Sequence, residues 1–567
     1  MSNEKISDLD GYIPFPEIRA RAYQEAGHWQ DLTFHDLLDQ AGNRNPEQAF
    51  AVGPHGETTY AEAIENTERI AAYLVGELGL KPLDIVAIQL TNRVEFLEFL
   101  FACSRVGVVP VMILPRHREA EARHVVDLTD AKGYVTLDTA DADRFDYMAM
   151  VDDIASELDS LDHLISVGDG KGVDGWISYS ELINTDWTTE YGELVEAIDV
   201  NPNAPGIMLL SGGTTGMPKG IPRTHNDYIF QWGRWEEVIG IESDWTLMPW
   251  VPIGHNASLN PIVGGAVMQG ATIALESPLK PESLLKRTVI EDVDFFFTVP
   301  TQLVDILEYK RIDEYDLSGV SAVISGGQKV RPRTVYELNE QWDIGVANIF
   351  GMAEGPLICT RPDDPVEVQA ETVGRPVAPG ADEFRIVDEQ REEEVSVETS
   401  GELAARGPGV FTGYFRNSEE NAENFDDEGW FYTEDVLELG NDGNYRVHGR
   451  LKDTIIRGGE NIYAPGVEDE LVEHPKIKNV AVIGMPDERL GERPMAYVEL
   501  EDEANSLSLA EVIEFLDERG MAVYKRPERL EIMGSLPRTE VGKISKANLR
   551  SRITEQLQQQ DEFPEDS

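Results

Sequence analysis

A glycine-rich segment at residues 211–220 constrains this chain more than any other stretch of its sequence. The segment reads Ser-Gly-Gly-Thr-Thr-Gly-Met-Pro-Lys-Gly, and it directly follows the apolar run 206–210, which is typical of a buried strand. Its glycines allow a tight turn with exposed backbone N–H groups, its hydroxyl groups can donate hydrogen bonds, and Lys219 adds a positive charge. The sequence therefore predicts a loop that binds a polyphosphate.

Two other interpretations of this segment are less satisfactory. A Walker loop needs Gly-Lys followed by Ser or Thr, whereas here Pro218 precedes Lys219 and Gly220 follows it. A flexible glycine linker does not normally carry a Thr-Thr pair and a lysine directly after a buried strand. The phosphate-binding loop remains the preferred interpretation.

The rest of the chain alternates strand and helix patterns from about residue 59. Such alternation favours α/β layers with parallel sheets, in which ligands bind beyond the carboxyl ends of strands. Glycine-bearing segments stand at such ends after residues 210, 324 and 350. The clearest predicted strands are 84–90, 206–210, 293–298, 320–324 and 346–350, and the clearest predicted helices are 60–78, 301–309 and 332–341.

The chain has 567 residues, which is too long for one hydrophobic core, so at least two domains are expected. The expected fold class is α/β, with a large N-terminal domain of layered sheets and helices that carries a small β-rich subdomain at about 380–450. A small α+β C-terminal domain should begin near residue 452, with a strand at 480–483 and a helix at 508–519. We place the domains at 1–451 and 452–555, and we expect the polar tail 556–567 to be disordered.

Charge is the second conspicuous property of the sequence. The chain has 105 acidic and 48 basic side chains, a formal net charge of −57. Such a chain repels nucleic acid and anionic membranes. Because the acidic residues are spread along the whole sequence and not confined to one acidic tail, we expect a halophilic protein adapted to molar salt, where self-repulsion is screened.

The remaining composition favours a cytoplasmic protein. The two cysteines, Cys103 and Cys359, imply buried thiols and no disulfide framework. The acidic N-terminus lacks the apolar core of a signal peptide, and the apolar stretch 96–114 is broken by charged residues, Gly107 and Pro110. We interpret that stretch as a buried helix followed by a buried strand.

Four further motifs follow the glycine-rich segment in a characteristic order. They are Phe350-Gly-Met-Ala-Glu354, Tyr432-Thr-Glu-Asp435, Gly449-Arg-Leu-Lys-Asp453 and Gly542-Lys543. Together the five motifs resemble those of the adenylate-forming superfamily, which comprises acyl-CoA synthetases, adenylation domains and luciferases. The resemblance covers nearly the whole chain.

This resemblance implies a site for ATP and Mg²⁺. Glu354 would bind Mg²⁺, which takes one or two carboxylates plus phosphate oxygens. Lys219 and Lys543 would be catalytic, with Lys543 bridging the substrate carboxylate and the α-phosphate, and Asp435 and Arg450 would hold the ribose hydroxyls. A surface glutamate and a solvated surface lysine are the alternatives for Glu354 and Lys543. The implied nucleotide-binding residues are Ser211, Gly212, Gly213, Thr214, Thr215, Gly216, Gly327, Phe350, Asp435 and Arg450.

Within the superfamily, the chain is most similar to the aryl-acid ligases, such as 2,3-dihydroxybenzoate–AMP ligase. Ala353 stands where most members have Thr, and the string 223–228 resembles the same subgroup. The implied acid-binding residues are His255, Asn256 and Gly326, with Asn256 bonding an ortho-hydroxyl group. The aromatic residue that usually follows the Asn is absent, since Ala257 stands there. For His255, an ordinary core histidine is the alternative.

The resemblance also implies a second half-reaction. Lys452 would be the hinge about which the small domain moves, and Gly458 and Gly459 would face a pantetheine channel. We therefore expect an ATP-dependent ligase, a monomer or homodimer, that adenylates an aromatic acid and passes the acyl group to CoA or to the phosphopantetheine of a carrier protein. The alternatives are an acyl-CoA synthetase for an aliphatic or fatty acid and a non-catalytic nucleotide-binding sensor on the same fold.

The net charge of −57 generates the first prediction, which concerns stability. The melting temperature should rise as KCl increases from about 0.05 to 3 M, because this range shortens the Debye length from above about 10 Å to under about 3 Å. Differential scanning calorimetry measures it directly. A melting temperature that stays flat or falls with salt would contradict the prediction.

Overall fold

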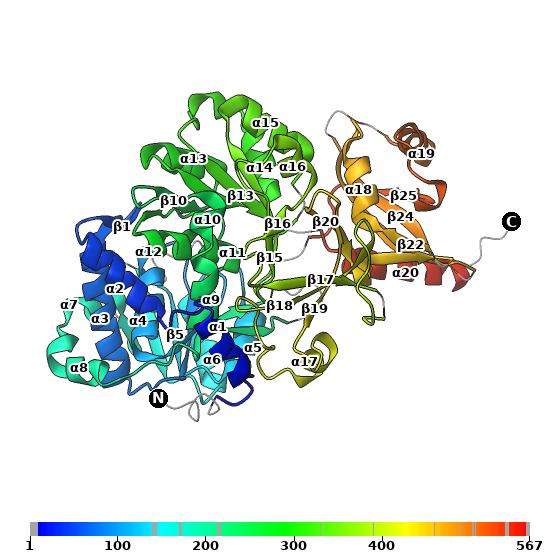
Figure 1. Cartoon of the computed structure of the whole chain (residues 1–567). Coiled ribbons are helices and arrows are strands. Elements are labelled where there is room, and N and C mark those ends of the chain that lie inside the picture. Colours follow the sequence, from blue (N-terminus) through cyan, green and yellow to red (C-terminus); the bar gives the residue numbers. More distant parts are fainter. Residues whose placement is uncertain are drawn as a thin grey trace. The chain divides into compact units, whose positions relative to one another are not determined.

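Parallel strands flanked by helices build most of the chain, as Figure 1 shows. The computed structural model describes residues 9–138, 145–168, 173–211, 217–328, 330–388, 390–458, 460–487, 489–501, 504, 506–538 and 544–562. The chain divides into two units. Of the described residues, unit 1 comprises those in 9–211, 217–384 and 405–431, and unit 2 comprises those in 385–404 and 432–562.

The larger sheet of unit 1 has nine strands in the order β16-β15-β14-β13-β12-β10-β11-β1-β2. Its central pairs are parallel. Both faces of these strands are covered, which explains their continuous apolar sequences. The strands are β1 (Ala49–Gly53), β2 (Gly56–Thr59), β10 (Thr246–Pro249), β11 (Thr272–Ala274), β12 (Phe295–Thr298), β13 (Ala322–Gly326), β14 (Gly345–Gly351), β15 (Leu357–Cys359) and β16 (Arg375–Pro376).

Successive side chains of this sheet enter two different hydrophobic cores, as strand geometry requires. In β12, Phe295 and Phe297 belong to the main core of unit 1, whereas Phe296 lies between them in a second core. The second core is completed by three helices on one side of the sheet, α13 (Pro281–Ile290), α14 (Pro300–Leu307) and α15 (Pro332–Trp342). The sheet is thus fixed on both faces, and the loops that follow its strands have a rigid base.

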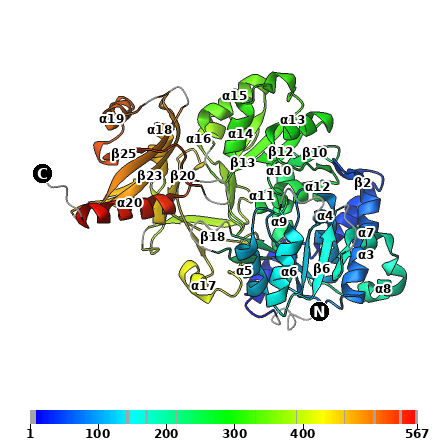
Figure 2. The ribbon, with the colours of Figure 1, turned by 180° about the vertical axis from the view of Figure 1, so that it is seen from behind.

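The second sheet of unit 1 has seven strands in the order β7-β6-β5-β3-β4-β8-β9, and all its pairs are parallel except β8 with β9. Its buried side chains enter the same main core as Phe295 and Phe297. The view from behind shows α6 (Tyr147–Glu157) beside this sheet (Figure 2). The strands are β3 (Ile85–Gln89), β4 (Val109–Met112), β5 (Gly133–Leu137), β6 (His163–Val167), β7 (Trp176–Ser178), β8 (Pro205–Leu210) and β9 (Gly220–Thr224).

Helices fill the space around the main core of unit 1. The buried face of α4 (Val94–Val106) includes Phe96, Phe99 and Leu100, none of which is exposed. Together with β4, it confirms the expected buried helix and strand at 96–114. The other helices of unit 1 are α1 (Glu17–Glu25), α2 (Phe34–Arg44), α3 (Tyr60–Gly76), α5 (Glu119–Thr129), α7 (Tyr179–Asn184), α8 (Trp187–Glu196), α9 (His225–Trp232), α10 (Trp235–Ile239), α11 (Asn256–Ser258), α12 (Gly265–Gln269), α16 (Val366–Glu371) and α17 (Ser418–Asn424).

A four-stranded sheet, in the order β17-β18-β19-β20, contains the residues at which the chain passes from one unit to the other. Its strands are β17 (Glu383–Val387), β18 (Ser400–Arg406), β19 (Phe431–Leu439) and β20 (Tyr445–Arg450). They form the small β-rich subdomain that the sequence predicted at about 380–450.

The remainder of unit 2 is an α+β structure, as predicted. Its five-stranded sheet has the order β22-β21-β24-β23, with β25 paired to β24. Ile455, Val482 and Val498 of the sheet pack with Leu471 and Leu516 in one core. The elements are β21 (Thr454–Arg457), β22 (Glu460–Tyr463), α18 (Ala464–Val472), β23 (Ile477–Asp487), β24 (Gly491–Leu500), α19 (Leu509–Glu518), β25 (Arg529–Ile532) and α20 (Lys546–Glu562).

The C-terminal helix corrects one expectation. The sequence led us to expect disorder from residue 556, but α20 continues to Glu562. Leu549 and Ile553 are buried in a core of unit 2, and Leu557 packs against that core from the next turn. These three residues are spaced four apart on one helix face, so their burial stabilises a helix whose other residues are almost all polar. Residues 563–567 lie outside the described part of the chain.

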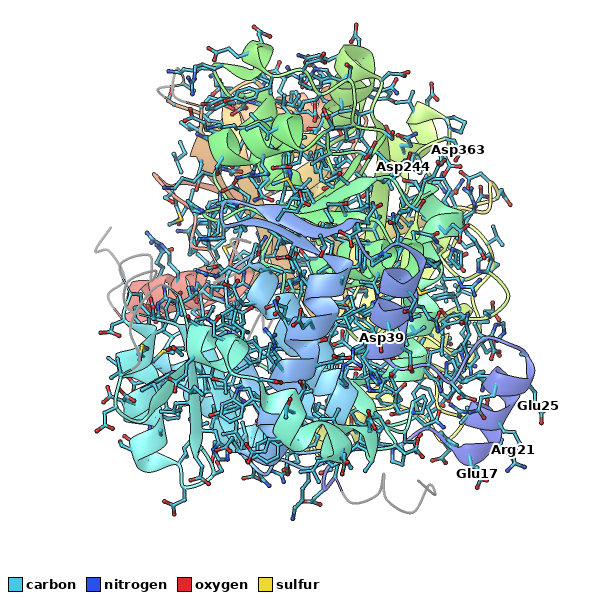
Figure 3. All side chains as sticks on the ribbon, turned by 90° about the vertical axis from the view of Figure 1, so that its left-hand side faces the viewer. Glu17, Arg21, Glu25, Asp39, Asp244 and Asp363 are labelled. Carbon is cyan, nitrogen blue, oxygen red and sulfur yellow. The ribbon has the colours of Figure 1, made fainter. Side chains whose placement is uncertain are left out.

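The described residues carry the expected thiols and surface charge. Both cysteines are free and buried. Figure 3 labels exposed carboxylates on well-separated elements, including Glu17 and Glu25 on α1, Asp244 before β10 and Asp363 before α16. In the part of the chain that the structure describes, no helix combines the length and apolarity needed to cross a membrane.

Candidate functional site

The predicted phosphate loop lies between two paired strands. β8 and β9 run antiparallel, with Leu210 opposite Gly220. At the neck of the loop, the Ser211 N–H donates to the Lys219 carbonyl oxygen and the Lys219 N–H donates to Ser211 Oγ, both at 3.0 Å. Ser211 and Lys219 therefore hydrogen-bond to each other in both directions at the base of the loop. The loop residues Gly212, Gly213, Thr214, Thr215 and Gly216 lie outside the described residues, and their binding of phosphate stays a prediction.

The Lys219 side chain lies between a carboxylate and an aromatic ring. Its Nζ atom is 2.5 Å from Glu420 Oε1 and 4.9 Å from the centroid of the Tyr414 ring. About a third of the Lys219 side chain, 34%, is exposed. The ammonium group is thus held near the neck of the loop while one side of it can still reach a dissolved anion.

Glu354, the predicted Mg²⁺ ligand, follows strand β14 and is held by a residue from a distant part of the sequence. The Tyr414 hydroxyl donates to Glu354 Oε1 at 2.9 Å, and the Phe411 N–H donates to the Glu354 carbonyl oxygen at 2.8 Å. Tyr414 therefore contacts both Glu354 and Lys219. Three residues brought together from 219, 354 and 414 form one polar cluster in unit 1.

Arg223, which follows the glycine-rich segment in sequence, does not belong to that polar cluster. Its side chain has no exposure and makes three strong interactions. Nε donates to Asp227 Oδ1 at 3.0 Å, and the two terminal nitrogens donate to the carbonyl oxygens of Ala353 at 2.7 Å and Gly409 at 2.8 Å. Arg223 thus cannot contact a dissolved anion; it joins β9 to the loop that carries Glu354.

His225 is also inside the core, with no exposure. Its Nδ1 atom accepts from the Phe34 N–H at 3.4 Å, and its ring packs edge-on against the Phe34 ring. Burial lowers the pKa of His225 to about 3, so the ring is neutral at physiological pH. His225 is a packing residue and supplies no charge to the site.

The predicted acid-binding residues gather near the start of α11. His255 Nδ1 accepts from the Ala257 N–H at 3.1 Å, which caps this helix. The buried Tyr228 hydroxyl donates to Asn256 Oδ1 at 2.8 Å, and Asn256 Nδ2 faces the Met352 carbonyl oxygen at 3.5 Å. Both contacts orient the amide in the same way, so Asn256 directs its N–H₂ group toward the segment that precedes Glu354.

The other predicted acid-binding residue, Gly326, and two of the predicted nucleotide-binding residues lie on neighbouring strand ends. Gly326 ends β13 and pairs with Ile349 of β14, and a Cβ atom there would lie 2.4 Å from Ile349 Cγ2. Gly327 follows in a left-handed conformation, with φ +85°. Phe350 is half-buried beside this turn in the same sheet. The carboxyl ends of β13 and β14 thus bring these residues together, as expected for a parallel sheet.

The predicted ribose-binding pair is formed within unit 2. Asp435 of β19 lies directly opposite Arg450 of β20, and Arg450 Nε donates to Asp435 Oδ1 at 3.0 Å. Asp435 is buried, whereas 40% of the Arg450 side chain is exposed. Glu434, which precedes Asp435, has a left-handed backbone with φ +60°. A glycine would adopt that conformation without strain.

The predicted hinge and thiol-channel residues also fall in unit 2. Lys452 lies in a short 3₁₀ turn, and its Nζ atom is 3.8 Å from Glu434 Oε2. Gly458 has φ +61°, and its N–H donates to the Leu490 carbonyl oxygen at 2.7 Å. Gly459 and the predicted catalytic Lys543 lie outside the described residues.

Three neighbours of the site escaped the sequence analysis. Tyr414 and Glu420 lie about 200 residues from Lys219 in sequence, and Tyr228 was noted only as part of the string 223–228. No local pattern signals that Tyr414 bonds Glu354 or that Tyr228 orients Asn256. The folded arrangement of the two sheets and α17 creates these contacts.

Comparison with known families decides the classification. The model of the AMP-binding enzyme family matches residues 38–415, about two thirds of the chain, and the model of its C-terminal domain matches residues 466–543. The chain belongs to the AMP-binding enzyme family. Both units therefore contain segments that match this family's models.

The chain is also similar over nearly its full length to individual members of this family. It is 36% identical to the salicyl-AMP ligase / salicyl-S-ArCP synthetase of Mycobacterium tuberculosis, over 95% of this chain and 94% of that protein. It is 34% identical to the 2,3-dihydroxybenzoate-AMP ligase of Bacillus subtilis, over 97% and 99%. Both proteins are similar along their whole length, and not in one domain only.

Solved structures confirm the predicted fold. The apo structure of Mycobacterium smegmatis MbtA is 34% identical, with a TM-score of 0.72 over 96% of this chain and 99% of that chain. An anthranilate CoA ligase, AuaEII, in complex with anthranoyl-AMP has a TM-score of 0.82 over 92% of this chain and 98% of its own, at 23% identity, and shows the shared fold alone. The α/β fold with a smaller C-terminal domain is thus the fold of this family.

The loop that carries Glu354 generates a prediction about packing. Gly355 has φ +124°, and a Cβ atom there would lie 2.1 Å from the Gly409 carbonyl oxygen and 2.7 Å from Val410 Cα. Because both obstacles are backbone, Gly355→Ala should lower the free energy of unfolding by about 3 kcal/mol or more. Urea denaturation in 3 M KCl measures the change.

Gly56→Ala is the matched control for this substitution. Gly56 has a similar φ of +119°, but nothing lies within 4 Å of the Cβ position. Gly56→Ala should therefore lower the free energy of unfolding only by the backbone strain, of order 1 kcal/mol. Equal losses for the two variants would show that the contact with Gly409 is not what makes Gly355 necessary.

Proposed function

We propose that this protein is an ATP-dependent acid–AMP ligase that activates an aromatic carboxylic acid carrying an ortho-hydroxyl group and then transfers the acyl group to a pantetheine thiol. The observation that carries the proposal is the oriented amide of Asn256, set by the Tyr228 hydroxyl at 2.8 Å within a chain of the AMP-binding enzyme family. Two relatives similar over nearly the whole chain support the substrate class, since they are named for salicyl and 2,3-dihydroxybenzoate substrates.

The chemistry explains why such an enzyme forms an adenylate first. A thiol cannot displace oxide from a carboxylate, because oxide is a poor leaving group. In the first step, a carboxylate oxygen attacks the α-phosphorus of ATP, the bond to the β-phosphate oxygen breaks and pyrophosphate leaves. In the second step, the thiolate attacks the acyl carbon and AMP leaves, while the thiol proton passes to solvent.

The cluster of Lys219, Tyr414 and Glu354 fits the first step. Lys219 would neutralise phosphate charge, which grows on the non-bridging oxygens in the transition state. Among the described residues, no three acidic, histidine or cysteine side chains gather to hold a metal by themselves. A single carboxylate together with phosphate oxygens suits Mg²⁺, so we propose that Glu354 binds Mg²⁺ and that Tyr414 orients its carboxylate. The bound ion would offset phosphate charge.

We propose the remaining roles from the same family motifs. Lys543 would bridge the acid and the α-phosphate, the Asp435–Arg450 pair would hold the ribose, and Phe350 with Gly327 would contact the adenine. The nucleotide phosphates would bind Ser211 and residues 212–216. Domains at 1–451 and 452–555 would move about Lys452, bringing Gly458 and Gly459 to the thiol channel.

The proposed acid-binding residues favour one ortho-hydroxyl group on the acid over two adjacent hydroxyl groups. Asn256 provides an amide N–H for an oxygen beside the carboxylate, and Ala257 offers no polar group for a second hydroxyl. A salicylate-like acid is therefore the proposed substrate. The acceptor is a carrier-protein phosphopantetheine or CoA; the family contains both kinds, since one relative is named a salicylyl-CoA synthase.

The surroundings of the protein are also part of the proposal. We propose a cytoplasmic enzyme from a halophilic cell, with a monomeric or homodimeric state and no nucleic-acid or membrane partner. The support is the net charge of −57 and the spread of exposed carboxylates over separate elements.

The acid specificity can be tested by acid-dependent ATP–pyrophosphate exchange in 3 M KCl. Salicylate should exceed benzoate in kcat/KM by about tenfold or more, because an amide that the bound acid shields from water without offering it a partner costs roughly 1–3 kcal/mol. Asn256→Ala should remove most of this preference while leaving exchange with benzoate nearly unchanged. Tyr228→Phe, which leaves the amide but frees its orientation, should reduce the preference in part. Faster exchange with medium or long aliphatic acids than with every aromatic acid would replace the proposal by an aliphatic acyl-CoA synthetase.

The role of Lys543 can be tested by separating the two half-reactions. Lys543→Ala should abolish adenylate formation, with a loss of at least about 3 kcal/mol in transition-state stabilisation. Thioester formation from supplied acyl-adenylate should remain mostly intact, because Lys543 acts in only one of the two domain arrangements. Near-normal pyrophosphate exchange by the variant would eliminate the assignment. Absence of exchange by the wild-type protein with every acid would instead favour a nucleotide sensor.

A further inference from the structure

The Glu420 carboxylate of helix α17 contacts Lys219, the lysine that is proposed to bind phosphate. Glu420 Oε1 lies 2.5 Å from Lys219 Nζ, and Asn424, one turn further along α17, donates from Nδ2 to Glu420 Oε2 at 3.1 Å. One carboxylate oxygen is thus held by the helix and the other is directed at the ammonium group. The two side chains are exposed to a similar extent, 34% for Lys219 and 31% for Glu420.

The same helix fixes the aromatic ring beside this ion pair. Asn421 accepts from the Tyr414 N–H at 2.7 Å through Oδ1 and donates to the Tyr414 carbonyl oxygen at 2.8 Å through Nδ2. The Tyr414 ring lies under the Lys219 ammonium group at 4.9 Å, and its hydroxyl bonds Glu354 at 2.9 Å. The position of Glu420 relative to Lys219 is therefore set by three hydrogen bonds of two α17 side chains, Asn421 and Asn424, and is not that of a freely moving surface residue.

The charges of this cluster oppose the binding of a polyphosphate. Glu354 would share its charge with a divalent ion, but Glu420 offers no such function, and it occupies the charged face of Lys219. A phosphate oxygen that approaches Lys219 must displace the carboxylate of Glu420 or bind beside a like charge. Both alternatives weaken the interaction of Lys219 with an anion.

We propose that Glu420 is the internal counter-ion of Lys219, which the phosphates of ATP displace, and that it thereby sets the affinity of the enzyme for ATP. This inference rests on the proposed function, because it takes Lys219 as a phosphate-binding residue. Since both groups are partly exposed, the effect decreases as salt screens the charges. The affinity for ATP should then depend least on Glu420 in molar salt.

The test compares Glu420→Gln with Glu419→Gln, its matched control. Glu419 precedes it in α17 and is exposed, so the control makes the same change in net charge without touching Lys219. The Kd for ATP is measured by isothermal titration calorimetry without acid, and the KM for ATP by pyrophosphate exchange. The lowest KCl concentration is chosen so that the wild-type protein melts at least about 15 °C above the assay temperature. The protein then stays folded during the measurement.

Glu420→Gln should bind ATP about two- to fivefold more tightly than the wild type at the lowest salt, the range expected for a partly exposed ion pair. The difference should shrink toward none at 3 M KCl, and Glu419→Gln should resemble the wild type throughout. In a Lys219→Met background, Glu420→Gln should have no effect, because the two residues then share no interaction.

Three results would overturn the inference. They are an unchanged or weakened affinity in Glu420→Gln, an equal gain in Glu419→Gln, and a gain that persists without the Lys219 ammonium group. These results differ from failure of the proposed function, in which the wild-type protein binds no ATP at any salt concentration. Melting temperatures of all variants, measured in the same buffers, identify any variant that is unfolded. If Glu420→Gln is unfolded, Glu420→Ala replaces it under the same criteria.

Discussion

The arrangement of the polar cluster depends on the ion pair and hydrogen bonds of the buried Arg223 guanidinium group. Burying a charge costs several kcal/mol unless partners surround it. Here Asp227 supplies the opposite charge, and the carbonyl oxygens of Ala353 and Gly409 accept the remaining donors at 2.7 and 2.8 Å. Gln231 reinforces the arrangement, since its Nε2 atom donates to the carbonyl oxygens of Gly355 at 2.6 Å and Gly409 at 2.9 Å.

These bonds connect three separated parts of unit 1. Arg223 lies in β9, directly after the predicted phosphate loop, while Ala353 and Gly409 belong to the loops that carry Glu354 and lead to Tyr414. A change in the position of one loop would therefore shift the other loops. This explains how the Lys219 ammonium group and the Glu354 carboxylate, 135 residues apart in sequence (219 and 354), occupy one cluster, and why a side chain at Gly355 would collide with the Gly409 carbonyl oxygen.

The sequence predicted what local patterns determine. Apolar runs such as 293–298 became strands, and glycine-bearing segments were found where strands end, because those features depend on period and turn chemistry. The burial of Arg223 was not predicted, because the sequence alone does not show whether a charged residue beside a motif is buried. Tyr414, Tyr228 and Glu420 were missed because their partners lie 28 to 201 residues away and only the folded sheets bring them together. The end of α20 was missed because its stabilising face has only three apolar residues.

Hydrogen exchange of Arg223→Lys tests most directly whether this buried guanidinium holds the loops together. A lysine ammonium group cannot reach all three acceptors, because it lacks the planar fork of arginine. In 3 M KCl, peptides covering 353–355 and 407–411 should exchange at least about tenfold faster than in the wild-type protein. Peptides covering β3 and β5 in the same sample should stay protected. Wild-type exchange rates in both loops of a folded variant would contradict the account.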